Sequence, residues 1–136
     1  MAHEELEMTL DHVTLSVEDL DRADDFYGKL LSSIGFEKVA DFSDDDAGES
    51  YIGFGIGRKG SLWIVDAGLQ TPGFHLCFRS KSRQDVRDFH AAGLAAGDED
   101  NGRPAIREIY HPAYYAAFVL DPEGHNIEAV CFEAET

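Results

Sequence analysis

Cysteine is nearly absent from this sequence, with two residues in 136. Cys77 and Cys131 lie in apolar, strand-like runs and lack the CxxC spacing of a metal or redox pair, so neither a disulfide framework nor a thiolate zinc site is expected. Both are expected to be buried as small hydrophobic side chains. The chain must therefore rely on a hydrophobic core, for which its length is sufficient in one compact domain.

Basic residues are also few. Eleven Lys and Arg stand against twenty-seven Asp and Glu, which gives a formal net charge of −16. A field of this sign repels the phosphate backbone of nucleic acids and anionic lipid surfaces, so no nucleic acid and no membrane is expected as a partner. The acidity itself is interpreted as a solvated surface.

Long apolar runs are missing as well. No eighteen consecutive apolar residues occur, and the acidic first eight residues lack the apolar segment of a signal peptide, which favours a cytoplasmic protein. The glycines within 53–60 form no phosphate loop, since no helix start or Lys-Ser pair follows them. What the sequence does have is 43% hydrophobic residues, with nine Phe, five Tyr and one Trp, which is a globular composition.

The first half of the chain predicts the order β-α-β-β-β. Polar and apolar residues alternate over 11–17, which is typical of a half-buried strand. Over 19–34 apolar residues recur at steps of three and four, which predicts an amphipathic helix that ends at Gly35. The other elements expected here are an acidic loop (41–48) and two strands (50–57 and 61–65) joined by a turn (58–60).

The same pattern restarts at Phe74. His12 and His75 are 63 positions apart, and so are Phe26 and Phe89, so a switch from strand to helix recurs at a fixed distance from an outward histidine. This repetition predicts a duplication. The elements expected in the second half are a strand from 74, a helix from 82 to 96, a loop (98–104), strands at 107–110, 114–120 and 126–132, and a turn (121–124).

The predicted fold class is α+β, with two tandem βαβββ modules that form a curved mixed sheet around a cleft. The modules are placed at about 9–67 and 72–134 of a single domain spanning 1–136. Each sheet must bury its helix-covered face, which leaves the opposite faces to form the cleft. Strand parity directs five side chains toward that cleft. They are His12, Thr14, His75, Cys77 and Glu128.

Three of these side chains, His12, His75 and Glu128, are of types that bind metals. Two neutral imidazoles and one carboxylate suit a divalent cation and leave positions open for water or substrate. A structural zinc would have four protein ligands, but the strand position of the first half that corresponds to Glu128 holds Trp63. The identity of the metal stays open among Fe, Mn, Ni and Zn, since the affinity order alone does not select one.

Two stretches of the sequence carry a family resemblance. They are Asp11-His12-Val13 leading into Asp25-Phe26-Tyr27, and the run from Phe118 through Asp121-Pro122-Glu123-Gly124 to Glu128. With them the whole chain resembles the vicinal oxygen chelate superfamily of glyoxalases, bleomycin resistance proteins and extradiol dioxygenases. The resemblance implies that His12, His75 and Glu128 bind one divalent metal ion, which chelates two oxygens of a small-molecule substrate. It also implies a homodimer, with ligands from one chain or shared between two.

The reaction stays open between isomerase or lyase chemistry and ring-cleaving dioxygenase chemistry. Typical glyoxalase I activity is not expected, because Trp63 stands where that enzyme would supply a further acidic ligand. The extradiol signature is matched only in part, because it has a tyrosine where this chain has Phe118, which cannot donate a hydrogen bond. The catalytic candidates are Tyr114 or Tyr115 in place of that tyrosine, and His111 as an acid or base near neutral pH.

The substrate-binding candidates are Trp63, Arg79 and Phe118. Trp63 would line a site for a ring-bearing substrate or simply fill the core, and Arg79 would bind a substrate carboxylate or form a surface ion pair. Two function classes therefore remain. The first is a metal-dependent enzyme acting on a small oxygen-chelating or aromatic compound. The second is a metal-free module that sequesters a small planar molecule, although burying the ligand set without a cation would leave polar groups unsatisfied.

Overall fold

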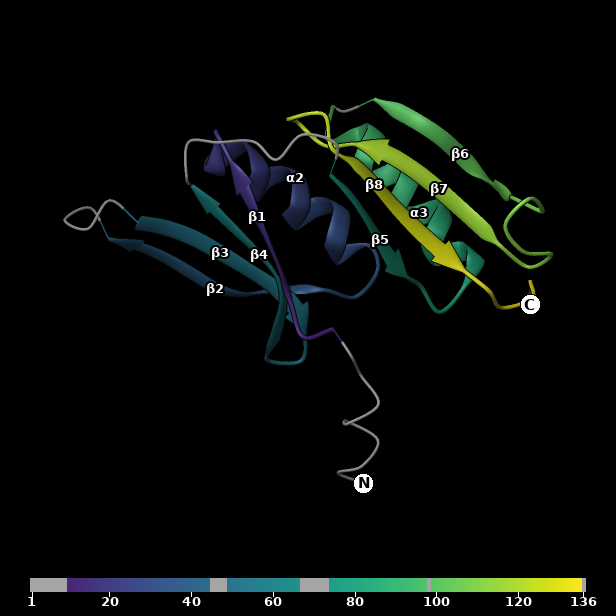
Figure 1. The fold of residues 1–136 in the computed structure, drawn as a ribbon, viewed down its shortest axis with the longest axis horizontal. Helices are drawn as coiled ribbons and strands as arrows, with labels where there is room; N and C mark the ends of the chain where they lie inside the picture. Colours follow the sequence, from purple (N-terminus) through teal and green to yellow (C-terminus); the bar gives the residue numbers. More distant parts are fainter. Residues whose placement is uncertain (1–9, 45–48, 67–73, 98, 136) are drawn as a thin grey trace, which may run out of the picture.

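The computed structural model describes residues 10–44, 49–66, 74–97 and 99–135 as two four-stranded sheets and two helices (Figure 1). The strand orders are β1-β4-β3-β2 and β5-β8-β7-β6, and in each sheet the first strand pairs in parallel with the last. The elements are β1 (Val13–Val17), α2 (Leu20–Ser32), β2 (Glu37–Asp44), β3 (Glu49–Ile56), β4 (Lys59–Asp66), β5 (His75–Arg79), α3 (Arg83–Ala95), β6 (Asp100–Ile106), β7 (Tyr115–Leu120) and β8 (Asn126–Cys131).

The two halves repeat each other at the offset that the sequence predicts. Both helices have 13 residues, and each begins after a capping residue that accepts a hydrogen bond from the backbone N–H three positions later. The caps are Asp19, which accepts from Arg22 at 3.0 Å, and Ser82, which accepts from Asp85 at 3.1 Å. The predicted fold class of two tandem βαβββ modules is thereby confirmed.

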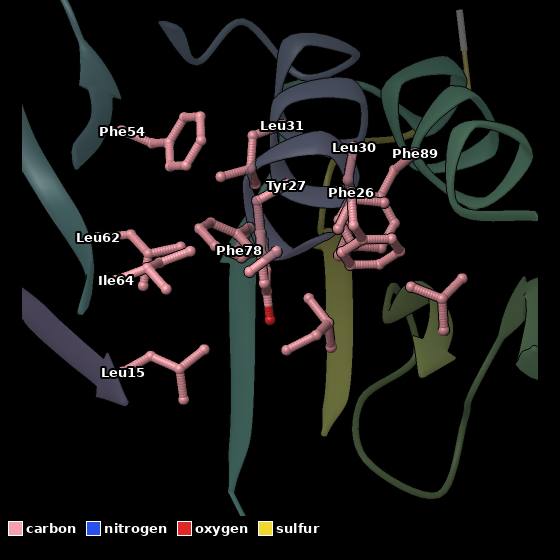
Figure 2. Close-up of a cluster of buried hydrophobic side chains, with 14 of the residues drawn as sticks. Leu15, Phe26, Tyr27, Leu30, Leu31, Phe54, Leu62, Ile64, Phe78 and Phe89 are labelled. Atoms are coloured by element: carbon pink, nitrogen blue, oxygen red, sulfur yellow. The ribbon is translucent and has the colours of Figure 1, made fainter. Parts of the chain in front are cut away.

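The helix-covered faces of both sheets share one hydrophobic core. Each helix packs on its own sheet and the two helices also contact each other, with α2 lying between the sheets in Figure 1. In Figure 2, Leu62 and Ile64 of the first sheet meet Tyr27 and Leu31 of α2. Because the two covered faces turn toward a common centre, the opposite faces of the two sheets are turned outward, away from each other.

A buried polar network ties the modules together inside this core. The Tyr27 hydroxyl of α2 donates to Asp121 Oδ2 at 2.6 Å, and His125 Nδ1 lies 2.9 Å from the same oxygen. Asp121 and His125 are almost fully buried in the turn that precedes β8. Such a satisfied network fixes how the first helix sits against the second sheet.

β2 extends into the segment that the sequence predicts as an acidic loop. Residues 41–44, expected in an acidic loop, belong to β2, while 45–48 lie outside the described residues. Phe42 pairs with Tyr51 of β3, and their rings stack with centroids 5.0 Å apart. The prediction was wrong because pairing with β3 outweighs the low strand propensity of the aspartates around Phe42.

The second hairpin is also shifted. The expected strand at 107–110 is a turn, closed by a bond from the Arg107 N–H to the Tyr114 carbonyl at 2.7 Å, and the expected loop contains β6 instead. Gly102 and Pro104 are disfavoured in central strands, but β6 is an edge strand with an irregular register, where both residue types are tolerated. Ile109 consequently lies in the turn and is 87% exposed.

Neither helix of the described residues is long and apolar enough to cross a membrane.

Candidate metal-binding site

The outward face of the second sheet carries two of the three predicted metal ligands. His75 begins β5, and Glu128 lies in the middle of the adjacent β8, where it pairs with Cys77. Strand alternation puts His75, Cys77 and Glu128 on the outward face, while their neighbours Phe78 and Ala129 point into the core. The His75 Nε2 atom lies 2.9 Å from Glu128 Oε1.

The hydrogen bonds of His75 identify the atom that would bind a metal. Its Nδ1 lies 3.0 Å from the backbone carbonyl oxygen of Asn126, and since a carbonyl only accepts, Nδ1 carries the hydrogen. A neutral imidazole then presents the lone pair of Nε2 to Glu128 Oε1, which is also an acceptor. Either a proton on Nε2 or a cation bound by both atoms satisfies this contact, and an imidazole with a carboxylate is a donor set that divalent metal ions accept.

Tyr114 fixes the other oxygen of the Glu128 carboxylate. Its hydroxyl donates to Glu128 Oε2 at 2.5 Å, and the Glu128 side chain is only 4% exposed. Burial and the neighbouring Glu128 raise the pKa of Tyr114, so the phenol stays protonated and remains a donor. This bond leaves Oε1 directed at His75, which is how residues around a metal ligand orient it.

Tyr115 lies on the opposite face of the same sheet. Its hydroxyl accepts a bond from Arg87 Nη1 at 3.3 Å, and the Arg83 guanidinium lies 5.1 Å from its ring centroid. It therefore packs with α3 and away from Glu128. Of the two tyrosines offered as catalytic candidates, the geometry brings only Tyr114 to the proposed ligands.

Cys77 and Phe118 flank Glu128 in the sheet register. The expectation that both cysteines are buried is wrong for Cys77, which is exposed on this face, and right for Cys131. Desolvation and the Glu128 carboxylate raise the pKa of the Cys77 thiol to about 12, so without a metal it is protonated at neutral pH. The Phe118 ring stacks beside His75 with centroids 6.2 Å apart and forms a wall of the site.

An aromatic cluster lies beside the ligand pair. The Phe132 ring contacts Tyr114 at 5.4 Å and His111 at 5.5 Å, and the Arg79 guanidinium lies 5.1 Å from the Phe132 centroid. His111 is exposed, and its Nδ1 accepts a bond from the Ala113 N–H at 2.9 Å. His111 and Arg79 thus lie at the edge of the site, with Phe132 between them.

The outward face of the first sheet forms a separate hollow of about 640 Å³ around Trp63. The indole lies against two glycines, because a Cβ added to Gly53 or Gly60 would come within 2.5 Å of its ring. Trp63 pairs with Thr14 just as Glu128 pairs with Cys77 in the second sheet, which agrees with the alignment of Trp63 to the acid.

His12 lies in this hollow, immediately before β1. Its Nδ1 is 2.6 Å from Asp11 Oδ1, which also accepts a bond from Lys59 at 2.6 Å. Lys59 first and then His12 lower the pKa of Asp11, which is therefore an ionised acceptor, so His12 donates to it from Nδ1 and Nε2 is the ring nitrogen left for another partner. His12 is half exposed.

Within one chain the three predicted ligands do not come together. Among the described residues, no three His, Cys, Asp or Glu side chains are grouped to hold a metal ion. The chain brings His75 and Glu128 together and places His12 on the other sheet. Sequence reasoning could not find this separation, because it follows from the packing of the two helices between the sheets and not from any strand pattern.

The comparisons with known proteins agree with this fold. A family sequence profile, described as the glyoxalase/bleomycin resistance protein/dioxygenase superfamily, matches residues 9–129. A glyoxalase/bleomycin resistance protein from Albidiferax ferrireducens is 27% identical, with a TM-score of 0.72 over 90% of this chain and 97% of that one. No curated protein matches the chain.

Two more distant structures show the fold alone. A glyoxylase/bleomycin resistance protein/dioxygenase domain from Frankia is 20% identical, with a TM-score of 0.70 over 91% of this chain and 97% of that one. A lactoylglutathione lyase from Agrobacterium tumefaciens is 18% identical, with a TM-score of 0.65 over 90% and 92%. On the match over residues 9–129 and the tandem βαβββ architecture, the chain belongs to the glyoxalase/bleomycin resistance protein/dioxygenase superfamily.

Proposed function

We propose that this protein is a divalent-metal-dependent enzyme acting on a small oxygen-chelating or aromatic substrate, by isomerase, lyase or ring-cleaving chemistry. Its metal would be held by His75 and Glu128 of one chain and His12 of a second copy. The observation that carries the proposal is the close approach of two metal-ligand side chains, with His75 Nε2 2.9 Å from Glu128 Oε1. Superfamily membership supports it.

A homodimer would bring the third ligand to this pair. A two-fold axis that places the first sheet of one chain over the second sheet of its partner creates two identical sites, each with all three ligands. Large exposed apolar side chains border both faces, which supports such an interface. They are Leu10 (69% exposed), which precedes Asp11 of the hollow around Trp63, and Tyr110 (65%), whose ring centroid lies 5.1 Å from that of Tyr114.

The residues of the chain divide the remaining tasks. A bound cation would supply Lewis-acid stabilisation of charge on the substrate oxygens. Tyr114 holds the Glu128 carboxylate in its ligating orientation, and Phe118 and Trp63 provide apolar walls that exclude water from a bound ring. Trp63 in place of a further acid disfavours typical glyoxalase I activity, since neither a fourth ligand nor a general base is present there.

A second candidate function is sequestration of a planar molecule without catalysis. The observation in its favour is the half-buried Trp63 ring, supported by Gly53 and Gly60 and close to Tyr51, with ring centroids 5.9 Å apart. Such a surface holds an aromatic ligand by stacking and needs no metal.

Metal analysis of protein purified without a tag separates the two functions. The enzyme proposal expects about one metal per chain, lost in His12→Ala and in His75→Ala. His90→Ala is the matched control. His90 lies on α3, and its Nε2 is 2.9 Å from Asp100 Oδ1 of β6, away from the proposed ligands. Metal-free wild-type protein that binds an aromatic ligand and ignores chelators would instead support sequestration.

A further inference from the structure

Basic residues gather at one place in an otherwise acidic molecule. Four of the eleven Lys and Arg residues fall within nine positions of the sequence, between the end of β5 and the second turn of α3. They line a hollow of about 850 Å³ at the N-terminus of α3. The four residues are Arg79, Lys81, Arg83 and Arg87. A net charge of −16 repels anions elsewhere, so only such a local excess could hold one.

Part of this positive charge has no ion-pair partner. Arg87 is paired with Glu135 through two contacts, of 3.0 and 3.2 Å. Among the described residues Lys81 forms no ion pair, whereas Arg79 and Arg83 lie over the rings of Phe132 and Tyr115. Arg83 is also close enough to Glu135 to help lower the pKa of that carboxyl. Arg83 donates from Nε to the Glu133 carbonyl oxygen at 3.3 Å, which leaves its terminal nitrogens available. Glu133 and Glu135 line the hollow as well, so four cationic side chains face two carboxylates there, and Lys81 and the terminal nitrogens of Arg83 remain to meet an anion.

The helix start adds donors of its own. Ser82 caps α3 by accepting the N–H of Asp85, which leaves the backbone N–H groups of Arg83 and Gln84 in the first turn without an intrahelical partner. The positive end of the helix dipole points the same way. Backbone donors and a helix dipole together form a recurrent oxyanion-binding arrangement.

One buried hydroxyl in the hollow has no partner. Ser80 is 6% exposed and lines the hollow, and its Oγ forms no hydrogen bond with any described residue. A buried hydroxyl left unpaired destabilises the fold unless something supplies the missing partner. A hydroxyl rotates freely, so it can donate to an oxygen brought into the hollow.

We propose that the hollow formed by Ser80, Lys81, Arg83 and the N-terminus of α3 is a binding site for an oxyanion, the phosphate or carboxylate group of a small metabolite. The site is separate from the proposed metal ligands, since Arg79 follows His75 by four strand residues, about 13 Å. Its occupation does not depend on any metal.

Isothermal titration with inorganic phosphate, and separately with succinate, tests this at ionic strength matched with sodium chloride. Wild-type protein is expected to bind at least one of the two saturably. Lys81→Gln and Arg83→Gln are each expected to weaken binding about tenfold, the loss that one charge-assisted hydrogen bond implies. Lys29→Gln, which removes a charge from α2, is the control and is expected to bind as wild type does.

Ser80→Ala provides an independent readout. Removing an unsatisfied hydroxyl is expected to leave the Tm of the anion-free protein unchanged or raised, while anion affinity falls severalfold. Because Lys81 is exposed and unpaired, a change in folding cannot account for the effect of Lys81→Gln. Absence of saturable binding, or equal affinity in Lys81→Gln, Arg83→Gln and wild type, would overturn the proposal.

Discussion

A mixture of two defective variants distinguishes a metal site shared between chains from a site within one. His12→Ala removes the ligand on the first sheet, and Glu128→Gln neutralises the carboxylate on the second while keeping its shape. His12 is half exposed, so its removal should not affect folding. Each variant alone is expected to bind no metal, because every one of its sites lacks a ligand.

The mixture is expected to recover part of the binding. After free exchange of subunits, half of the dimers contain one chain of each kind, and each such dimer has one site with both substitutions and one with neither. The recovered metal is therefore about one quarter of the wild-type amount, since half of the dimers carry one intact site out of two. A site formed within one chain would recover nothing, because each chain carries a defect.

The assay is metal content after desalting, with native mass spectrometry of the same sample to verify that mixed dimers have formed. A matched mixture of His12→Ala with His90→Ala controls for the effect of mixing: about half of the wild-type metal is expected whether or not subunits exchange, all of it from the sites that keep His12. Mixed dimers without recovered metal, or a wild-type protein that remains monomeric with metal bound, would refute the shared site.

Three further outcomes follow from the structure. Gly53→Ala is expected to displace the Trp63 ring and destabilise the protein by about 1–3 kcal/mol, seen in tryptophan fluorescence and chemical unfolding, whereas Gly28→Ala, with open space around it, should stabilise α2 by about 0.5–1 kcal/mol. Tyr114→Phe should lower metal affinity about 10–100-fold in a competition titration while leaving the fold intact. The pKa of Asp100 is lowered by its partner His90 and by the Gly102 backbone N–H. Its contribution to stability is therefore present above about pH 4 and lost as the pH falls through the lowered pKa. The Tm difference between wild type and Asp100→Asn should shrink over that range.

The sequence predicts the fold because the fold repeats local patterns. Alternation in β1 and three-four spacing in α2 are each set by one face being buried, and a second copy 63 positions later leaves little choice of architecture. The equivalence of Trp63 in the first module and Glu128 in the second also follows from counting along the strands. The register of β4 on β1 and of β8 on β5 agrees with that count.

The edge strands and the assembly of the site could not be predicted in the same way. β2 and β6 contain aspartate, glycine and proline, and they become strands because a neighbouring strand offers hydrogen-bond partners. The face on which His75 and Glu128 lie follows from parity, but their distance from His12 depends on how α2 and α3 pack. Nor does any pattern reveal the unpartnered Ser80, since a hydroxyl at that position is ordinary in sequence.

The proposed sharing of one metal between His12 of one chain and the His75–Glu128 pair of another predicts that metal binding and dimerisation are coupled. The Glu128 carboxylate is buried beside Tyr114 and lies 2.9 Å from His75 Nε2, whereas His12 is half exposed on the other sheet. If a cation joins the halves, it binds the dimer in preference to the monomer and stabilises the interface by linkage, about 1.4 kcal/mol for each tenfold excess over its dissociation constant. A chelator is therefore expected to raise the dimer dissociation constant measured by analytical ultracentrifugation, and His12→Ala to abolish that dependence. A dimer whose dissociation constant is the same with and without chelator would show that the two faces are not bridged by a metal.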